Sequence, residues 1–297
     1  MLIIYTTFVS RSGLGKLKGL TFVKLSARIW IMKKPFVLAV FLTVCATILF
    51  YPRPGFIEAA YKFNFVLTFL VLFLIFLLMA NTNSLKRSLI FFALSVFIAF
   101  GAEAKGVNLD HKFVYAPVNL ELFRVPISII TWWGIFISLC YCFTNTFLAW
   151  TKNAKPSLLN KGSFKFIPLM VVIDALLVSS IGLLVEPLGT YLGNWRWFSN
   201  SAYFGVPLAD FRGWFLVSGL CCLIIRVFEY YFPVNKKADY WAHLLVVLLF
   251  AFLNLNFARI AAGYGLTGVA LVGIYVTLPL VFVNLMLFLY RKPPSTK

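Results

Sequence analysis

The 297-residue sequence has few acidic residues and only two histidines. Nine Asp and Glu stand against 27 Lys and Arg, and charged residues make up only 12% of the chain. His111 and His243 are far apart, so a histidine-box oxygenase, which needs clustered ligands, is disfavoured. The sequence also has no P-loop, GxGxxG unit or GxSxG turn in a suitable context. These absences argue against the common nucleotide-dependent and serine hydrolase classes.

The five cysteines lack the spacing of a metal site. All of them fall within apolar runs, and none is paired with histidines as zinc or cluster binding requires. They are Cys45, Cys140, Cys142, Cys221 and Cys222. We therefore expect no disulfide, no metal and no cofactor, and cofactor-free chemistry is the default hypothesis.

Long apolar runs recur along the whole chain, in which 62% of the residues are hydrophobic. About 20 apolar residues cross a bilayer core as a helix. The runs are continuous rather than alternating between apolar and polar residues, so a transmembrane barrel is not expected. We predict an all-α, polytopic transmembrane helical bundle of about eight spans. The predicted spans lie near residues 35–51, 63–80, 85–101, 126–149, 166–187, 207–231, 241–258 and 265–290.

The basic residues alternate between the two sides of these spans as the positive-inside rule predicts. With the N-terminus in the cytoplasm, the basic clusters at 11–34, 86–87, 152–165, 236–237 and 291–297 all lie on the cytoplasmic side. We therefore predict an integral protein of the cytoplasmic membrane with both termini in the cytoplasm. The net charge of +18 then reflects topology, and nucleic acid is not an expected partner, because no soluble basic surface is predicted.

The chain is predicted to hold a single integral membrane helical domain, residues 35–292. Residues 1–34 form a basic N-terminal extension, read either as an interfacial helix or as a segment without a functional role. Residues 293–297 form a short cytoplasmic tail. We expect no cleavable signal, because the first apolar run is long enough to remain as a span.

Acidic residues gather on the side opposite the basic clusters. Six of the nine lie there in this topology: Glu58, Glu103, Asp110, Glu121, Glu186 and Asp210. The stretch 186–214 adds two arginines, three tryptophans and four glycines. Charged groups at a membrane boundary are costly, so they are usually paired, line a cavity or take part in chemistry. We predict a functional site at this end, although any single acid can instead neutralise an arginine or cap a helix.

Asp174 stands apart from this group, within the fifth predicted span. A lone acid inside a membrane helix needs a polar partner. We expect that partner to be Asn145 or Ser179.

Carboxyl groups and aromatic rings without a metal suit the protonation of an alkene. A carboxyl group in an apolar pocket has a raised pKa and can donate its proton near neutrality. The tertiary carbocation is stabilised by the faces of tryptophan and tyrosine rings. A second carboxylate then orients water, or removes a neighbouring proton if the outcome is isomerisation or cyclisation.

The run WRWFSNSAYFGVPLADFRGWF, residues 195–215, closely resembles a signature of carotenoid-biosynthesis membrane proteins. That family includes carotenoid 1,2-hydratase and bisanhydrobacterioruberin hydratase, in which a W-x-W pair precedes a Y-F-G-(V/I)-P-x-x-N-F-x-G-W run. The matching residues are Trp195, Trp197, Tyr203, Phe204, Gly205, Val206, Pro207, Phe211, Gly213 and Trp214. A second block resembles the segment with Glu103, Gly106, Tyr115, Val125, Pro126 and Trp132. The resemblance covers about residues 95–230.

The sequence departs from the family pattern in its acids. Where the family has D-L-x-x-D-P before the W-x-W pair, this chain begins with Gly182 and ends with Glu186 and Pro187. The family's asparagine before F-x-G-W is Asp210 here. The family's glycine-rich segment is reduced to residues 108–115. A carboxylate has thus changed position within the motif, which implies either a changed site geometry or a different function.

The resemblance implies hydration of the terminal C1=C2 double bond of an acyclic carotenoid end, giving a tertiary 1-hydroxyl group. In this hypothesis Glu103 or Glu186 is the general acid and Asp210 positions the water. Arg196 and Arg212 are expected to keep carboxylates ionised, so that the acid farther from them is the better proton donor. The rings expected to bind substrate are those of Tyr115, Trp132, Trp195, Trp197, Tyr203, Phe204 and Trp214.

Two other functions remain open, and some of the ring assignments also have an alternative. A non-catalytic scaffold that binds polyisoprenoid pigment is one, and a transporter of small lipophilic molecules is the other. The transporter is less favoured because no internal repeat is visible and the polar residues gather at one face rather than at the midplane. Trp132, Trp133 and Trp195 can also be interfacial belt residues. Expected partners are an acyclic carotenoid or other polyisoprenoid, membrane lipid and other carotenoid-pathway enzymes.

Overall fold

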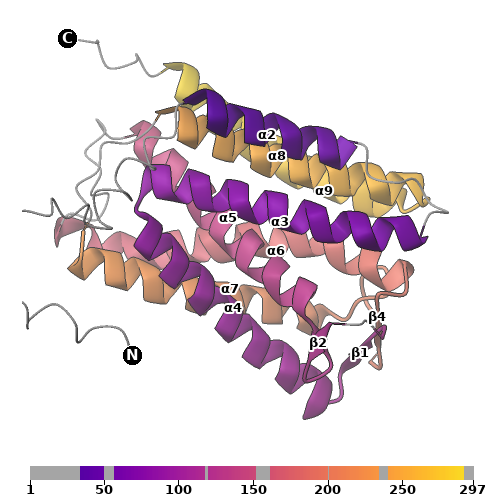
Figure 1. The fold of residues 1–297 in the computed structure, drawn as a ribbon. Helices are drawn as coiled ribbons and strands as arrows, with labels where there is room; N and C mark the ends of the chain where they lie inside the picture. Colours follow the sequence, from indigo (N-terminus) through magenta and orange to yellow (C-terminus); the bar gives the residue numbers. More distant parts are fainter. Residues whose placement is uncertain are drawn as a thin grey trace, which may run out of the picture.

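A computed structural model describes residues 34–49, 57–117, 120–151, 161–199, 201–233 and 240–290. Within these residues eight α-helices form a bundle (Figure 1). The helices are α2 (Lys34–Leu49), α3 (Ile57–Thr82), α4 (Leu85–Asn108), α5 (Ile127–Thr151), α6 (Ile167–Tyr191), α7 (Leu208–Tyr231), α8 (Tyr240–Gly263) and α9 (Thr267–Tyr290). A short 3₁₀ helix, η1 (Lys161–Phe166), leads into α6. The predicted extension, apart from Lys34, and the predicted tail lie outside the described residues.

Each predicted span overlaps one helix, but the number of spans is not confirmed. Six of the helices in the described residues, α4 to α9, are long and apolar enough to cross a membrane. The described apolar parts of α2 and α3, Phe36–Thr47 and Val66–Thr82, are shorter. The third span also runs past its predicted end at residue 101, because α4 continues to Asn108 and carries Glu103 within the helix.

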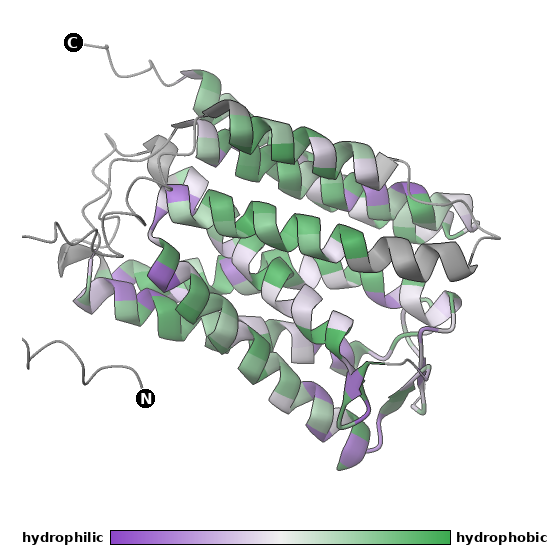
Figure 2. Cartoon of the chain, viewed as in Figure 1, coloured by the Kyte–Doolittle hydropathy of each residue, from purple (hydrophilic) through white to green (hydrophobic). Residues whose placement is uncertain are grey.

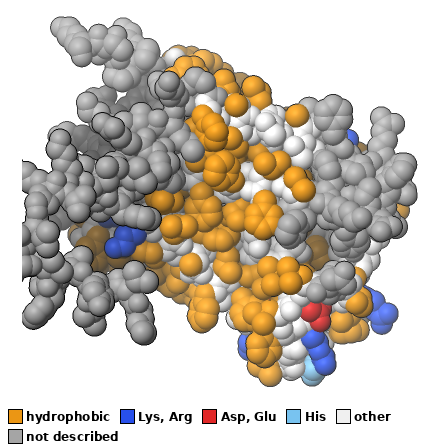
Figure 3. All heavy atoms as spheres, in the orientation of Figure 1, with side chains coloured by type: hydrophobic (Ala, Val, Ile, Leu, Met, Phe, Trp, Pro, Cys, Tyr) orange, Lys and Arg blue, Asp and Glu red, His pale blue; other side chains and the backbone are white. Residues whose placement is uncertain are grey.

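The bundle is built around α5, which is the most deeply buried of the six long helices. It packs against α3, α4, α6 and α8, while α6 with α7 and α8 with α9 form closely packed pairs. Apolar residues cover the helices along most of their length, and hydrophilic residues concentrate toward the ends (Figure 2). On the face drawn in Figure 3 a broad band of apolar side chains crosses the middle of the molecule. This is the surface expected of helices whose backbone groups are satisfied internally within lipid.

Two short antiparallel strand pairs lie together at one end of the bundle (Figure 1). In the first, β1 (Phe113–Tyr115) pairs with β4 (Trp195–Trp197); in the second, β2 (Glu121–Leu122) pairs with β3 (Val125–Pro126). The all-α prediction missed both pairs, because strands of two or three residues carry no periodic pattern. The β1–β4 pair joins segments separated by α5 and α6.

The C-terminus of α6 directs the chain into β4. Gly193 has a φ of +72°, the left-handed conformation that glycine adopts without strain. The N–H of Asn194 donates to the carbonyl of Gly189 at 2.9 Å, and the N–H of Gly193 donates to that of Thr190 at 3.1 Å. This is a Schellman arrangement, which ends the helix and turns the chain. Trp195 follows immediately, so the helix end fixes the start of the W-x-W strand.

Candidate active site

The structure brings Glu103, Glu186 and Asp210 together at the end of the bundle that carries the strand pairs. They come from three helices: Glu103 from the last turns of α4, Glu186 from the end of α6, and Asp210 from the first turn of α7. The three carboxyl groups are close enough for their charges to interact. We refer to these three residues as the carboxyl cluster.

Glu103 is held by two hydrogen bonds, one to each oxygen. The hydroxyl of Tyr115 donates to Oε2 at 2.7 Å, and the indole Nε1 of Trp133 donates to Oε1 at 2.7 Å. Burial raises the pKa of the Tyr115 phenol well above its ordinary value, and the neighbouring Glu103 charge adds to this, so the phenol stays a donor. With one donor on each oxygen, the Glu103 carboxyl group is fixed in position.

Glu186 has one oxygen bonded and one oxygen without a partner. The indole Nε1 of Trp214 donates to Oε1 at 3.1 Å. Oε2 is buried and accepts no hydrogen bond. The indole N–H of Trp195 also lies near this carboxyl group, but it does not reach hydrogen-bond geometry and is itself without a partner. Glu186 therefore presents a buried, free carboxyl oxygen to the site.

Asp210 presents a second free oxygen. Its Oδ2 is buried and has no hydrogen-bond partner. Asp210 and Trp214 are four residues apart on α7, so they share one face of the helix, and the Trp214 indole lies close to this carboxyl group as well. Trp214 thus stands between Glu186 and Asp210 and orients the first of them.

Two stacked indoles connect the cluster. The rings of Trp133 and Trp214 lie with their centroids 4.3 Å apart and their planes 34° apart. Trp133 donates to Glu103 and Trp214 donates to Glu186. Trp132, which the sequence motif predicts as a substrate-binding residue, packs on Phe136 with a centroid distance of 5.2 Å. Consecutive helical residues point in different directions, so sequence alone could not choose between Trp132 and Trp133.

The W-x-W pair is a strand with both indoles on one face. Trp195 lies opposite Tyr115 and Trp197 lies opposite Phe113, with ring centroids 6.0 Å and 4.7 Å apart. Trp195 is buried against Gly189, where an added Cβ would overlap its ring. Only glycine at that position allows the indole to pack so close to α6.

Arg196 and Arg212 do not pair with the carboxyl cluster in the described part of the chain. Arg196 lies on the outer face of β4, with its guanidinium over the ring of Phe198 at 5.6 Å. Arg212 is exposed on α7, and the ion pairs found among the described residues include neither arginine. Their expected action on the carboxylates therefore has no direct contact to support it.

Tyr203 supports the backbone beside Glu186. Pro187 lies inside α6 and has no N–H, so the carbonyl of Leu183 lacks its usual helical donor. The Tyr203 hydroxyl donates to this carbonyl at 3.2 Å, and burial raises the pKa of the phenol. Phe204, by contrast, is exposed and lies over Gly268 at the start of α9, away from the cluster's hydrogen bonds.

An exposed ion-pair group, which we call the rim pairs, lies at this end of the bundle. Asp110 pairs with Lys105 at 2.7 Å and with Lys112 at 2.9 Å. These hydrogen bonds, that from Lys105 first, lower the pKa of Asp110 below its ordinary value. Asp110 is therefore an exposed, ionised residue and not a candidate proton donor.

Asp174 has a different partner from the two expected ones. Its carboxylate forms a fully buried, bidentate ion pair with Arg226 on α7, with N–O distances of 2.5 and 2.8 Å. Arg226 also donates to Asn145 at 3.2 Å and lies over the ring of Tyr141 at 4.8 Å. Ser179 instead donates to the carbonyl of Ala175. The prediction of Asn145 or Ser179 as partner is wrong, because α6 packs against α7 and brings Arg226, 52 residues away in the sequence, to Asp174. We refer to Asp174, Arg226, Asn145 and Tyr141 as the Arg226 network.

Several buried polar atoms at the carboxyl end have no partner among the described residues. They are Oε2 of Glu186, Oδ2 of Asp210, Nε1 of Trp195, Nε1 of Trp197 and Oγ1 of Thr190. Buried polar groups are normally hydrogen-bonded, and exceptions that gather in one place call for a functional explanation. No group of three or more His, Cys, Asp or Glu in the described part of the chain is arranged to hold a metal ion. The free atoms are two carboxyl oxygens, a hydroxyl and two indole donors, a set suited to proton transfer and to binding a small polar reactant such as water.

Comparison with known proteins identifies one family. The family model described as carotenoid biosynthesis protein matches residues 63–280. The match includes all three members of the carboxyl cluster and confirms the resemblance seen in the motif. No curated protein and no solved structure matches the chain.

Proposed function

The chain belongs to the carotenoid biosynthesis protein family, and on that premise we propose that it adds water across the terminal C1=C2 double bond of an acyclic carotenoid end. The observation that carries the proposal is the pair of buried, free carboxyl oxygens on Glu186 and Asp210, held beside stacked tryptophans. A hydration needs an acid, an acceptor for a proton of water, and a surface that tolerates a cation.

Glu186 is the better candidate for the acid. Both oxygens of Glu103 already accept hydrogen bonds, whereas Oε2 of Glu186 is free. The proton moves from Oε2 of Glu186 to C2 of the alkene, which leaves a tertiary cation at C1. The indole rings of Trp195 and Trp214 lie beside Glu186, and we propose that aromatic rings of this site stabilise the cation.

Asp210 completes the addition. Its free Oδ2 accepts a proton from water as the water oxygen bonds to C1, giving the tertiary alcohol. The proton gained by Asp210 then replaces the one lost by Glu186, either directly or through solvent. The net change is one H and one OH added to the double bond, with no oxidant or reductant.

The altered acid motif is compatible with this arrangement. Gly182 stands where the resembling family members carry their first aspartate, and an added Cβ there would lie 2.9 Å from the Trp214 ring. A larger side chain at position 182 would displace the indole that orients Glu186. Asp210 supplies the second carboxyl group from α7 instead, so the number of acids is preserved.

The test is expression in a bacterial host that accumulates lycopene, with pigments separated by chromatography and identified by mass. We expect a product heavier by one water, and we expect Glu186→Gln to abolish it while the protein remains folded. Glu121→Gln is the matched control, because Glu121 is exposed on β2. Full activity of Glu186→Gln would remove Glu186 from the mechanism.

A non-catalytic pigment-binding scaffold is the second candidate. The observation that favours it is Gly182, which removes an acid that the resembling enzymes carry. Unchanged pigment that copurifies with folded protein would support this function over hydration.

A further inference from the structure

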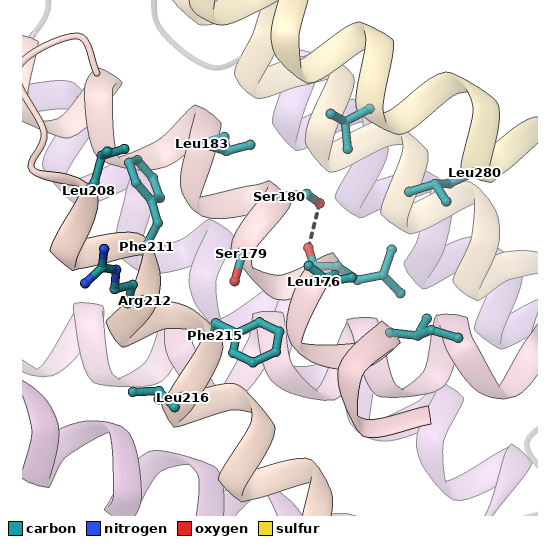
Figure 4. A pocket seen from close by; sticks show the side chains of 13 residues that line it. Leu176, Ser179, Ser180, Leu183, Leu208, Phe211, Arg212, Phe215, Leu216 and Leu280 are labelled. Atoms are coloured by element: carbon teal, nitrogen blue, oxygen red, sulfur yellow. Dashed lines mark hydrogen bonds between the residues drawn. The ribbon is translucent and has the colours of Figure 1, made fainter. Parts of the chain in front are cut away.

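An apolar groove of about 810 Å³ lies between α6, α7 and α9 (Figure 4). The hydroxyls of Ser179 and Ser180 face their own helix, donating to the carbonyls of Ala175 at 2.8 Å and Leu177 at 2.6 Å. These serines therefore make the groove wide without making it polar. Leu176 and Leu216 on its walls are 56% and 68% exposed, so the groove opens onto the apolar outer surface of the bundle.

One end of the groove adjoins the carboxyl cluster. Leu183 lines the groove with its side chain, while its carbonyl accepts the Tyr203 hydrogen bond one helical turn before Pro187. Phe211 also lines the groove, follows Asp210 directly, and meets the Tyr203 ring edge-to-face with centroids 5.5 Å apart. Tyr203 thus contacts two residues of the groove lining, and Leu183 lies three residues before Glu186 on α6.

The groove is elongated along the helices. Its lining on α6 runs from Ile173 to Leu183, which at 1.5 Å per residue corresponds to about 15 Å. This is about half of the hydrocarbon core of a bilayer. A long apolar chain that enters from the lipid would lie along this part of α6 and end at the level of the Leu183 carbonyl, which Tyr203 contacts.

We propose that this groove binds the extended isoprenoid chain of the substrate, with its terminal unit passing Tyr203 and Phe211 to reach Glu186. The occupant is a long unsaturated hydrocarbon chain, because the lining is apolar apart from Arg212 and the two serines, opens to lipid, and includes Leu183, three residues before Glu186 on α6. The inference rests on the proposed function for the identity of the reacting end, but binding of the chain can be measured without turnover.

The experiment measures pigment retained per protein after purification from a carotenoid-accumulating host. Ser179→Phe fills the groove, and Val172→Phe adds the same ring at an exposed α6 position outside its lining. Each is made in the Glu186→Gln background, so that turnover does not alter the bound pigment. We expect Ser179→Phe to lose about tenfold of the retained pigment, equivalent to about 1.4 kcal/mol, and Val172→Phe to retain it. Ser180→Leu is a second, smaller obstruction in case Ser179→Phe fails to fold.

The outcomes separate this proposal from hydration itself. If Ser179→Phe, Ser180→Leu and Val172→Phe all retain the same amount of pigment, the proposed binding of the chain in the groove is wrong, even if the unmodified chain makes the hydrated product. Loss of pigment only in the two groove variants would support the groove, even if no hydrated product forms. Bound phospholipid in place of pigment, identified by mass spectrometry, would also overturn it.

Discussion

The same two helices carry two buried polar centres that differ in how completely they are bonded. Measured along α6, Asp174 and Glu186 are about 18 Å apart, and along α7, Asp210 and Arg226 are about 24 Å apart. In the Arg226 network, both oxygens of Asp174 are paired with the guanidinium. In the carboxyl cluster, Glu186 and Asp210 each keep a free oxygen. A centre in which the carboxyl oxygens all have hydrogen-bond partners fixes the packing of helices. A centre with free carboxyl oxygens can interact with another molecule.

The difference has an energetic consequence. Removing one partner of a buried ion pair leaves an uncompensated charge, which typically costs 3–5 kcal/mol. Replacing Glu186 or Asp210 by its amide leaves no such charge and keeps an oxygen that can accept a hydrogen bond. Substitutions in the Arg226 network should therefore act on stability, and substitutions in the carboxyl cluster should act on activity.

The largest effect is expected from Arg226→Leu. This substitution leaves the buried Asp174 carboxylate without its charge partner. It should lower the free energy of unfolding by about 3–5 kcal/mol, measured by thermal or denaturant unfolding in detergent. The double variant Asp174→Leu/Arg226→Leu removes both charges and should recover most of this loss. If the double variant is as unstable as the single one, the ion pair is not the cause.

Asp210→Asn should separate activity from stability. Loss of the carboxylate that accepts a proton from water should reduce product formation about 100-fold, as typical of general base catalysis. The free energy of unfolding should change by less than about 1 kcal/mol, because no buried partner is left charged. A large loss of stability without loss of product would reverse the roles given to the two centres.

Gly189→Ala tests the position of the W-x-W strand. The added Cβ overlaps the Trp195 ring, and overpacking of this kind costs about 1–3 kcal/mol. Displacement of Trp195 should also reduce activity through the geometry around Glu186. Gly101→Ala is the control, because its Cβ would meet no atom within 4 Å.

The smallest effect is expected at the exposed rim. The pKa of Asp110 is lowered by Lys105 and Lys112, so its ionised form stabilises the folded state above the ordinary aspartate pKa of about 3.9. This contribution is lost as the pH falls below about 4 toward the folded-state pKa. Asp110→Asn should flatten the dependence of unfolding on pH in that range, and added salt should weaken the effect in the unmodified chain. If Asp110→Asn leaves the pH dependence of the free energy of unfolding unchanged, the ion pairs of Asp110 with Lys105 and Lys112 make no measurable contribution to stability.

Run lengths predicted the helices well, because they are a local property of the sequence. All eight predicted spans overlap helices in the described residues, although the count of spans is not confirmed for α2 and α3. The concentration of acids and aromatic residues also predicted that these residues share one end of the bundle, and that they form a functional site there stays a prediction. Glu103, Glu186 and Asp210 share that end because α4 ends there, α6 ends there and α7 begins there.

What the sequence did not predict depends on contacts between distant segments. The pairing of Asp174 with Arg226 joins residues 52 positions apart, and no local pattern marks it. Trp133 differs from Trp132 only in the direction it leaves α5, which is set by packing. Arg196 points outward because it alternates with two inward tryptophans in a strand whose partner is far away in sequence.

The β1–β4 pair also constrains the order in which the protein can mature. Its two strands flank α5 and α6, so both helices must be in place before Tyr115 and Trp195 can meet. Closing such a long loop is entropically costly and generally slow. During synthesis, Glu103 acquires its Tyr115 partner early in the sequence, but the wall formed by Trp195 and Trp197 waits for the end of α6. The cluster of Glu103, Glu186 and Asp210 with its aromatic lining is therefore expected to form only after α6, β4 and the start of α7 have been synthesised.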